Sequence, residues 1–107
     1  MPRLTHPPHM PKKVVEAIEV LGNRARTEIL HMLGRNDGLT VPEIAERLDL
    51  SRVSAHAHLQ ALERAGLVST DVPLEQRRGR LLHWHVDPAA VAQLAAVWAK
   101  YASGEEN

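Results

Sequence analysis

The chain contains no cysteine and no apolar run long enough to cross a membrane. The missing cysteines exclude disulfides and thiolate metal sites, and they fit a reducing compartment. Residues 1–11 have no apolar segment of the kind found in secretion signals, so neither a leader nor a membrane anchor is expected. We therefore expect a protein of the cytoplasm without a membrane partner.

Residue patterns typical of catalysis are also missing. The sequence has no glycine-rich phosphate loop, no cysteine nucleophile, and no serine, histidine and aspartate in a recognisable arrangement. Carboxylates such as Glu43 and Glu46 are three residues apart on a predicted helix, a spacing typical of a solvated face. We expect neither an enzyme nor a cofactor.

The charges balance, because thirteen lysines and arginines face thirteen aspartates and glutamates. A net charge of zero does not by itself favour a nucleic-acid partner, but the distribution of charge matters more than its sum. Arg77, Arg78 and Arg80 lie close together, so one face of a neutral protein can still be basic.

The composition of the two ends differs from that of the middle. Four of the seven prolines lie in residues 1–11, which predicts a flexible N-terminal arm. The acidic composition of residues 103–107 predicts a disordered tail. A single domain with a modest core is expected between them, over residues 12–102.

Apolar periodicity predicts four helices in the first part of this domain, at about residues 12–21, 24–34, 41–48 and 52–65. Asn23 and Ser51 are expected to cap the second and the fourth helix. Thr40 and Glu43 have the spacing of a capping box, and Pro42 falls in the first turn, where its missing N–H costs nothing.

After Gly66 the pattern changes to that of strands. Strands are expected at residues 67–72 and 80–86 with a loop at 73–79 between them, and Asp87-Pro88 begins a last helix that reaches about Ala102. The order is helix, helix, helix, helix, strand, strand, helix. This order predicts a mainly α (α+β) fold, a winged helix-turn-helix.

At this point the sequence resembles the ArsR-type winged-helix repressors. The matching segments are Leu21–Arg26 with Ile29-Leu30, Leu39–Ala45, Leu50-Ser51, His58-Leu59 with Leu62, Ala65–Val68, and Arg77–Arg80. The resemblance covers about residues 14–102 and implies a homodimer that represses transcription from a near-palindromic operator. The third helix lacks the Cys-x-Cys of the metal-sensing members, and the last helix lacks their histidine or aspartate pair. Regulation by arsenic, zinc or cadmium at those positions is therefore not expected.

The fourth helix is the predicted reading helix, because the N-terminal half of this element enters the major groove in the motif. On a helical wheel one face of this helix is apolar and is expected to point to the core. The candidate base readers outside that face are Arg52, Val53, His56 and Ala57. Arg52 can form two bonds with guanine, and Val53 can contact a thymine methyl, as can Ala57. The predicted phosphate contacts are Thr40, Ser51, Ser54 and Gln60, and the wing arginines Arg77, Arg78 and Arg80 suit phosphates or the minor groove.

The first and the last helix carry more apolar residues than a small core can cover from one side. The predicted dimer interface consists of Val14, Ile18, Leu21, Leu94, Trp98 and Tyr101. The last helix is also rich in alanine, which allows a partner helix to approach closely.

The sequence leaves two other functions open. A winged helix can be a protein-docking module without DNA binding, an idea that the apolar Val53, Ala57 and Ala61 support. A histidine-based metal-responsive regulator would use His83 and His85, which alternate on one strand face, but no third ligand has suitable spacing, so no metal site is predicted. His58 lies nearer the buried edge of its helix and is interpreted as a packed, hydrogen-bonded histidine.

Overall fold

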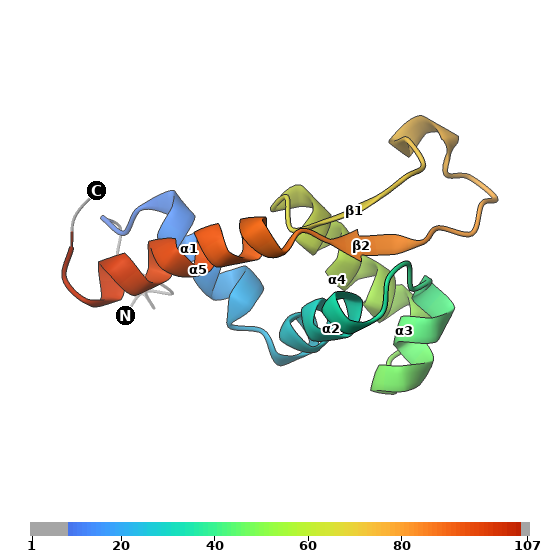
Figure 1. The fold of residues 1–107 in the computed structure, drawn as a ribbon, viewed down its shortest axis with the longest axis horizontal. Coiled ribbons are helices and arrows are strands. Elements are labelled where there is room, and N and C mark those ends of the chain that lie inside the picture. Colours follow the sequence, from blue (N-terminus) through green and yellow to red (C-terminus); the bar gives the residue numbers. More distant parts are fainter. Residues whose placement is uncertain (1–8, 106–107) are drawn as a thin grey trace, which may run out of the picture.

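The computed structural model describes residues 9–105 and has the predicted order of elements (Figure 1). The elements are α1 (Lys12–Leu21), α2 (Arg24–Arg35), α3 (Val41–Leu48), α4 (Arg52–Arg64), β1 (Val68–Thr70), β2 (Trp84–Val86) and α5 (Pro88–Ala102). The predicted arm and tail lie partly outside the described residues, and both stay predictions. The fold is a mainly helical winged helix-turn-helix.

The helix starts follow from the capping residues. Both halves of the capping box are present: the Thr40 amide donates to Glu43 Oε1 at 2.9 Å, and the Glu43 amide donates to Thr40 Oγ1 at 3.4 Å. Asn23, Ser51 and Asp87 each accept a bond from the amide three residues later. These side chains satisfy amides that a helix cannot pair internally, so they fix where α2, α3, α4 and α5 begin.

The turn between α3 and α4 is tight because Asp49 adopts the left-handed conformation, with φ of 54°. Aspartate tolerates this region better than most residues, since its short polar side chain can bond locally. The Leu50 amide donates to the Ala45 carbonyl at 2.9 Å, which closes the end of α3. The chain therefore turns within three residues, and α4 packs against α3.

The core lies between helices α1 to α5 and the hairpin, with α1 and α5 contributing fewer residues than α2, α3 and α4 together. Its largest fully buried side chains are Trp84, Ile29, Ile44, Leu59, Leu62, Leu67 and Val14. Ala55, Leu59 and Leu62 of α4 are completely buried. The inward face predicted for the reading helix is thus confirmed, and its opposite face must point away from the core.

The hairpin is shorter than predicted. β1 and β2 are antiparallel with Val68 opposite Val86 and Thr70 opposite Trp84, and residues 71–83 form a loop that contains a 3₁₀ turn, Leu74–Gln76. Pro73 cannot donate a bond to a sheet, and Gly79 has φ of 74°, so both belong to the loop, which extends beyond the predicted residues 73–79 on both sides. We call residues 68–86 the wing and residues 71–83 the wing loop.

The wing is also joined to the connection between α2 and α3. The Trp84 amide donates to the Leu39 carbonyl at 2.8 Å and forms an isolated bridge with that residue. Figure 1 shows the wing loop projecting at the end of the molecule opposite α1. The base of the wing is therefore fixed to the core, and its loop extends beyond it.

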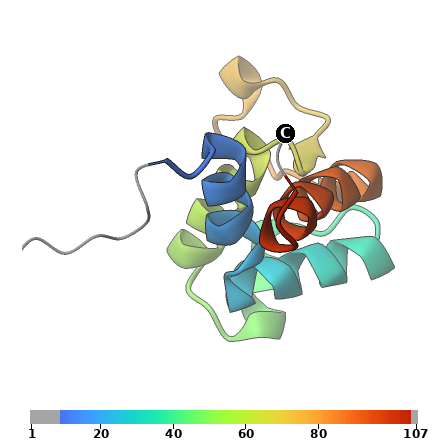
Figure 2. The ribbon, with the colours of Figure 1, turned by 90° about the vertical axis from the view of Figure 1, so that its left-hand side faces the viewer.

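α1 and α5 lie side by side, as both views show (Figures 1 and 2). Of the fifteen residues of α5, Leu94 is the one that is fully buried, although the helix is predominantly apolar. In the described part of the chain no helix combines the length and the hydropathy needed to span a membrane.

Candidate nucleic-acid interface

The outward face of α4 is accessible along its whole length. Six predicted contact residues on it are exposed: Arg52, Val53, Ser54, His56, Ala57 and Gln60. The side chain of Val53 stands out, because a branched apolar residue is left 80% exposed. Leaving such a side chain in water forgoes about 1.5–3 kcal/mol of burial, which a binding partner can recover. Ser51 is exposed as well, with its Oγ accepting the Ser54 amide at 3.0 Å.

A groove of about 600 Å³ brings the reading helix and the wing together. Its walls come from the start of α3, the outward face of α4 and the wing loop, and it is lined by Val41, Pro42, Arg52, Val53, His56, Gln60, Leu74, Arg77, Arg78, Arg80, Leu81 and Leu82. Candidate base readers and wing arginines, about 25 residues apart in sequence, therefore border one surface. The lining is mainly apolar with a cationic side, a composition that suits sugar edges and base methyls beside phosphates.

The three wing arginines do not behave alike. Arg78 and Arg80 are exposed, as expected for phosphate contacts. The guanidinium of Arg77 instead donates to Glu63 Oε1 at 3.0 Å and to Glu63 Oε2 at 2.6 Å, and its Nε donates to the Val72 carbonyl at 2.9 Å. Its Cζ also lies 5.6 Å from the centre of the Trp84 ring. These three bonds direct the Arg77 side chain toward Glu63 and Val72, so its predicted phosphate contact is not supported.

This ion pair changes the titration of both partners. The hydrogen bonds from Arg77 hold the pKa of Glu63 below its usual range, and Glu63 raises the pKa of Arg77. Sequence reasoning missed the pair because the partners are fourteen residues apart on different elements, and no local pattern indicates such a contact.

Thr40 also differs from its predicted role. Its side chain is 6% exposed, and its hydroxyl donates to Glu43 Oε1 at 3.0 Å while it accepts the Glu43 amide. The bonds from Thr40 lower the pKa of the Glu43 carboxyl. The hydroxyl is thus committed to starting α3, and the expected phosphate contact of Thr40 is not supported.

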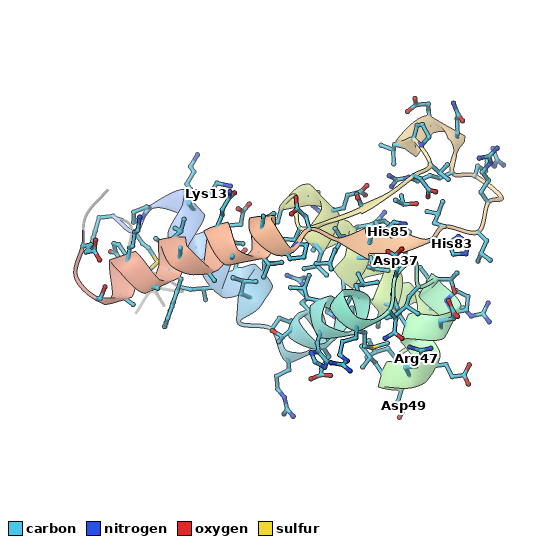
Figure 3. All side chains as sticks on the ribbon, in the orientation of Figure 1. Lys13, Asp37, Arg47, Asp49, His83 and His85 are labelled. Atoms are coloured by element: carbon cyan, nitrogen blue, oxygen red, sulfur yellow. The ribbon has the colours of Figure 1, made fainter. Side chains whose placement is uncertain are left out.

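The histidines have separate environments. His58 Nδ1 accepts a bond from Arg26 Nε at 3.2 Å, and burial lowers its pKa, as expected for a packed histidine. His85 Nδ1 lies 2.6 Å from Asp37 Oδ1, a contact that the sequence did not reveal (Figure 3). Within residues 9–105, no three histidine, aspartate or glutamate side chains gather to hold a metal ion.

The predicted dimer residues divide into two sets. Val14 and Leu94 are 1% and 6% exposed, so they belong to the core of the protomer, and their assignment to an interface is corrected. Ile18 and Trp98 are 44% and 50% exposed, and Leu21 and Tyr101 are half-buried. An apolar groove of about 340 Å³ between α1 and α5 is lined by Ala17, Ile18, Leu21, Gly22, Ala95 and Trp98.

Comparisons with known proteins place this geometry in a family. Residues 21–71 match the model of a helix-turn-helix domain family. The chain is 39% identical over 70 residues to an uncharacterized HTH-type transcriptional regulator of Methanocaldococcus jannaschii, MJ0229. The aligned region covers 65% of this chain and 73% of that protein. It is 41% identical over 58 residues to the transcriptional activator HlyU of Vibrio cholerae, which covers 54% of this chain and 53% of HlyU.

Solved structures agree in fold. A possible transcriptional regulator for arsenical resistance superposes with a TM-score of 0.66 at 28% identity, over 80% of this chain and 83% of that one. A second structure is Mb0332 of Mycobacterium bovis, described as a homodimeric winged helix-turn-helix DNA-binding domain of a possible ArsR-family regulator. It superposes with a TM-score of 0.60 at 25% identity, over 88% of this chain and 82% of that one.

The fold and the surface formed by α4 and the wing define a winged helix-turn-helix transcriptional regulator. The chain belongs to the HTH-type transcriptional regulators. Within that class it is ArsR-like, because it shares its fold with solved structures described as ArsR-type regulators.

Proposed function

We propose that this protein binds double-stranded DNA sequence-specifically and acts in the cytoplasm as a homodimeric repressor on a near-palindromic operator. The observation that carries the proposal is the single groove formed by the exposed face of α4 and the wing arginines. It combines side chains that distinguish base pairs with cations that attract phosphates, which are the two requirements of a sequence-reading protein.

In this proposal the N-terminal half of α4 enters the major groove. Arg52 donates two bonds to a guanine, Val53 packs on a thymine methyl, and His56 and Ala57 contact the next base edges. Ser51, Ser54 and Gln60 contact phosphate oxygens around the reading helix, while Arg78 and Arg80 contact phosphates from the wing. Because the net charge of the chain is zero, this local cluster supplies the attraction.

The homodimer is supported by the two terminal helices. α5 is apolar yet mostly accessible, and with α1 it borders a groove that leaves Ile18 and Trp98 half exposed. One winged helix reads one half-site, and two copies related by a two-fold axis read two, which raises affinity by linking the binding events. The homodimeric state of Mb0332 supports this arrangement.

The test is a selection of genomic fragments by the purified protein, followed by titration of the selected duplex and of a random-sequence duplex over a range of salt. We expect tight binding to an inverted repeat and steeply salt-dependent binding to both duplexes. A reporter downstream of the selected site should be less active when the protein is present. Absence of salt-dependent DNA binding would favour the protein-docking alternative, and increased reporter activity would make the protein an activator, as HlyU is described.

A further inference from the structure

The wing loop is attached to the reading helix through one side chain. Arg77 donates twice to Glu63 of α4, once to the Val72 carbonyl at the start of the loop, and lies against the ring of the buried Trp84. The Arg77 side chain is 17% exposed and that of Glu63 is 29% exposed, so water competes only partly for the pair. We call the set of Glu63, Val72, Arg77 and Trp84 the wing latch.

Apart from the packing of Leu82 against the core, few contacts fix the position of the loop. The strands pair over three residues each, and the backbone bonds inside the loop are local, such as Gln76 to Pro73 and Arg80 to Arg77. Among residues 9–105, the two Arg77–Glu63 bonds are the side-chain hydrogen bonds that connect the wing loop to a helix. Two parallel bonds between a guanidinium and a carboxylate fix orientation as well as distance.

The latch lies between the two sets of proposed DNA contacts. Glu63 follows Gln60 by one helical turn, and Arg77 immediately precedes Arg78. We propose that Glu63 and Arg77 are positioning residues, which hold Arg78 and Arg80 where they can reach phosphates while α4 occupies the major groove. This inference rests on the proposed DNA binding and adds a role for an acidic residue within a phosphate-binding surface.

The sign of the effect of removing Glu63 distinguishes this role from simple electrostatics. Removing a carboxylate beside DNA lowers repulsion, so Coulomb's law alone predicts tighter binding for Glu63→Ala. The latch predicts weaker binding, because freed wing arginines lose phosphate contacts. Glu75→Ala is the matched control, since it removes the same charge from an exposed position of the wing loop.

The experiment titrates the full chain and its variants with a random-sequence duplex between about 50 and 200 mM salt. We expect Glu63→Ala to bind roughly threefold to tenfold more weakly with a salt slope lower by about one to two units, whereas Glu75→Ala keeps the wild-type slope or binds more tightly. Arg77→Lys should follow Glu63→Ala, because lysine keeps the charge but cannot form the paired bonds. In an Arg78→Ala, Arg80→Ala background, Glu63→Ala should have no further effect on the slope.

A merely structural role for Glu63 would leave a different signature. Partial unfolding lowers the number of active molecules, but the salt slope of the folded remainder stays that of the wild type. The latch would be overturned if Glu63→Ala or Arg77→Lys kept the wild-type salt slope. It would also be overturned if Glu63→Ala lowered the slope by its full amount in the Arg78→Ala, Arg80→Ala background. Either result would leave the proposed DNA binding intact. A wild type that shows no salt-dependent binding would overturn both proposals.

Discussion

Solvent exposure divides the arginines near the proposed interface by role. Arg52, Arg78 and Arg80 are exposed and free to meet DNA, whereas Arg77 is held by Glu63 and Arg26 donates to His58 and to the Glu19 carbonyl. Sequence reasoning treated the wing arginines as one group because adjacency is all that a sequence displays. Their separation depends on which partner the fold brings near each side chain.

Truncating Arg52 or His56 should reduce specificity more than affinity for DNA in general. Each alanine variant should cost about 1–3 kcal/mol on the selected operator and much less on random duplex, because base-edge bonds exist only on the correct sequence. Fluorescence titrations of both duplexes measure the difference. Equal losses on the two duplexes would show that these residues position the protein and do not read bases.

Replacing Arg78 and Arg80 by alanine should weaken binding to all duplexes similarly. The salt slope should fall by roughly one unit for each lost phosphate contact, because fewer counterions are released. Titrations at several salt concentrations provide the slope, with Arg35→Ala on the exposed end of α2 as a control that removes a cation outside the groove. An unchanged slope in the double variant would remove the wing from the interface.

The environment of His58 should make stability depend on pH. Burial and the neighbouring Arg26 lower the pKa of His58, so the unfolded chain binds a proton at a higher pH than the folded protein does. The stabilisation is therefore complete above the unfolded pKa of about 6.5 and is lost as the pH falls below it. The measurement is the denaturant midpoint of each protein at pH 7.5 and at pH 5.5, values chosen on either side of about 6.5. The midpoint should decrease from the higher to the lower pH in the wild type, and it should decrease less in His58→Asn.

The control for this prediction is His31→Asn, since His31 lies on an exposed face of α2. It should retain the pH dependence of the wild type. The idea would be abandoned if His58→Asn kept that dependence too.

At the level of elements, the helices could be predicted from the sequence and the hairpin only in part. Local side chains such as Asn23, Thr40 and Ser51 define helix starts through bonds that span three residues, so their signals are present in the sequence itself. The wing loop is tied to Glu63 by Arg77, a contact between distant segments that the sequence does not display. The exposed face of α4 was predicted because a helical wheel needs only periodicity, whereas the roles of Thr40 and Arg77 required tertiary contacts.

The two faces of α4 should respond differently to truncation. Leu59→Ala should lower the free energy of unfolding by about 2–5 kcal/mol, because it leaves a cavity at a fully buried position. Gln60→Ala, one residue further along on the exposed face, should change stability by less than about 0.5 kcal/mol. Urea denaturation measures both. The assigned faces would be contradicted if Leu59→Ala lowered the free energy of unfolding by less than Gln60→Ala does.

For the whole molecule, the proposed dimer depends on the surface where α1 and α5 meet. Trp98→Glu places a charge beside the apolar groove at a half-exposed position, so the protomer should fold while the dimer dissociates. Sedimentation equilibrium should show a wild-type dimer at tens of micromolar, roughly the range where a specific dimer persists, and a monomeric variant. DNA affinity should fall with dissociation.

Gln93→Glu serves as the control, because it adds the same charge at an exposed position of α5 outside the groove. It should remain dimeric. A wild type that is monomeric at that concentration would disprove the interface.

The placement of the two tryptophans has an optical consequence. Trp84 is completely buried at the base of the wing, with the Arg77 guanidinium against its ring, while Trp98 is half exposed beside the groove between α1 and α5. Indole emission shifts to longer wavelength in water, so the blue part of the spectrum originates from Trp84 and the red part from Trp98. Iodide, which quenches only accessible rings, separates the two signals. The chain thus carries one intrinsic fluorophore at the base of its wing and another at the surface where a second copy would bind.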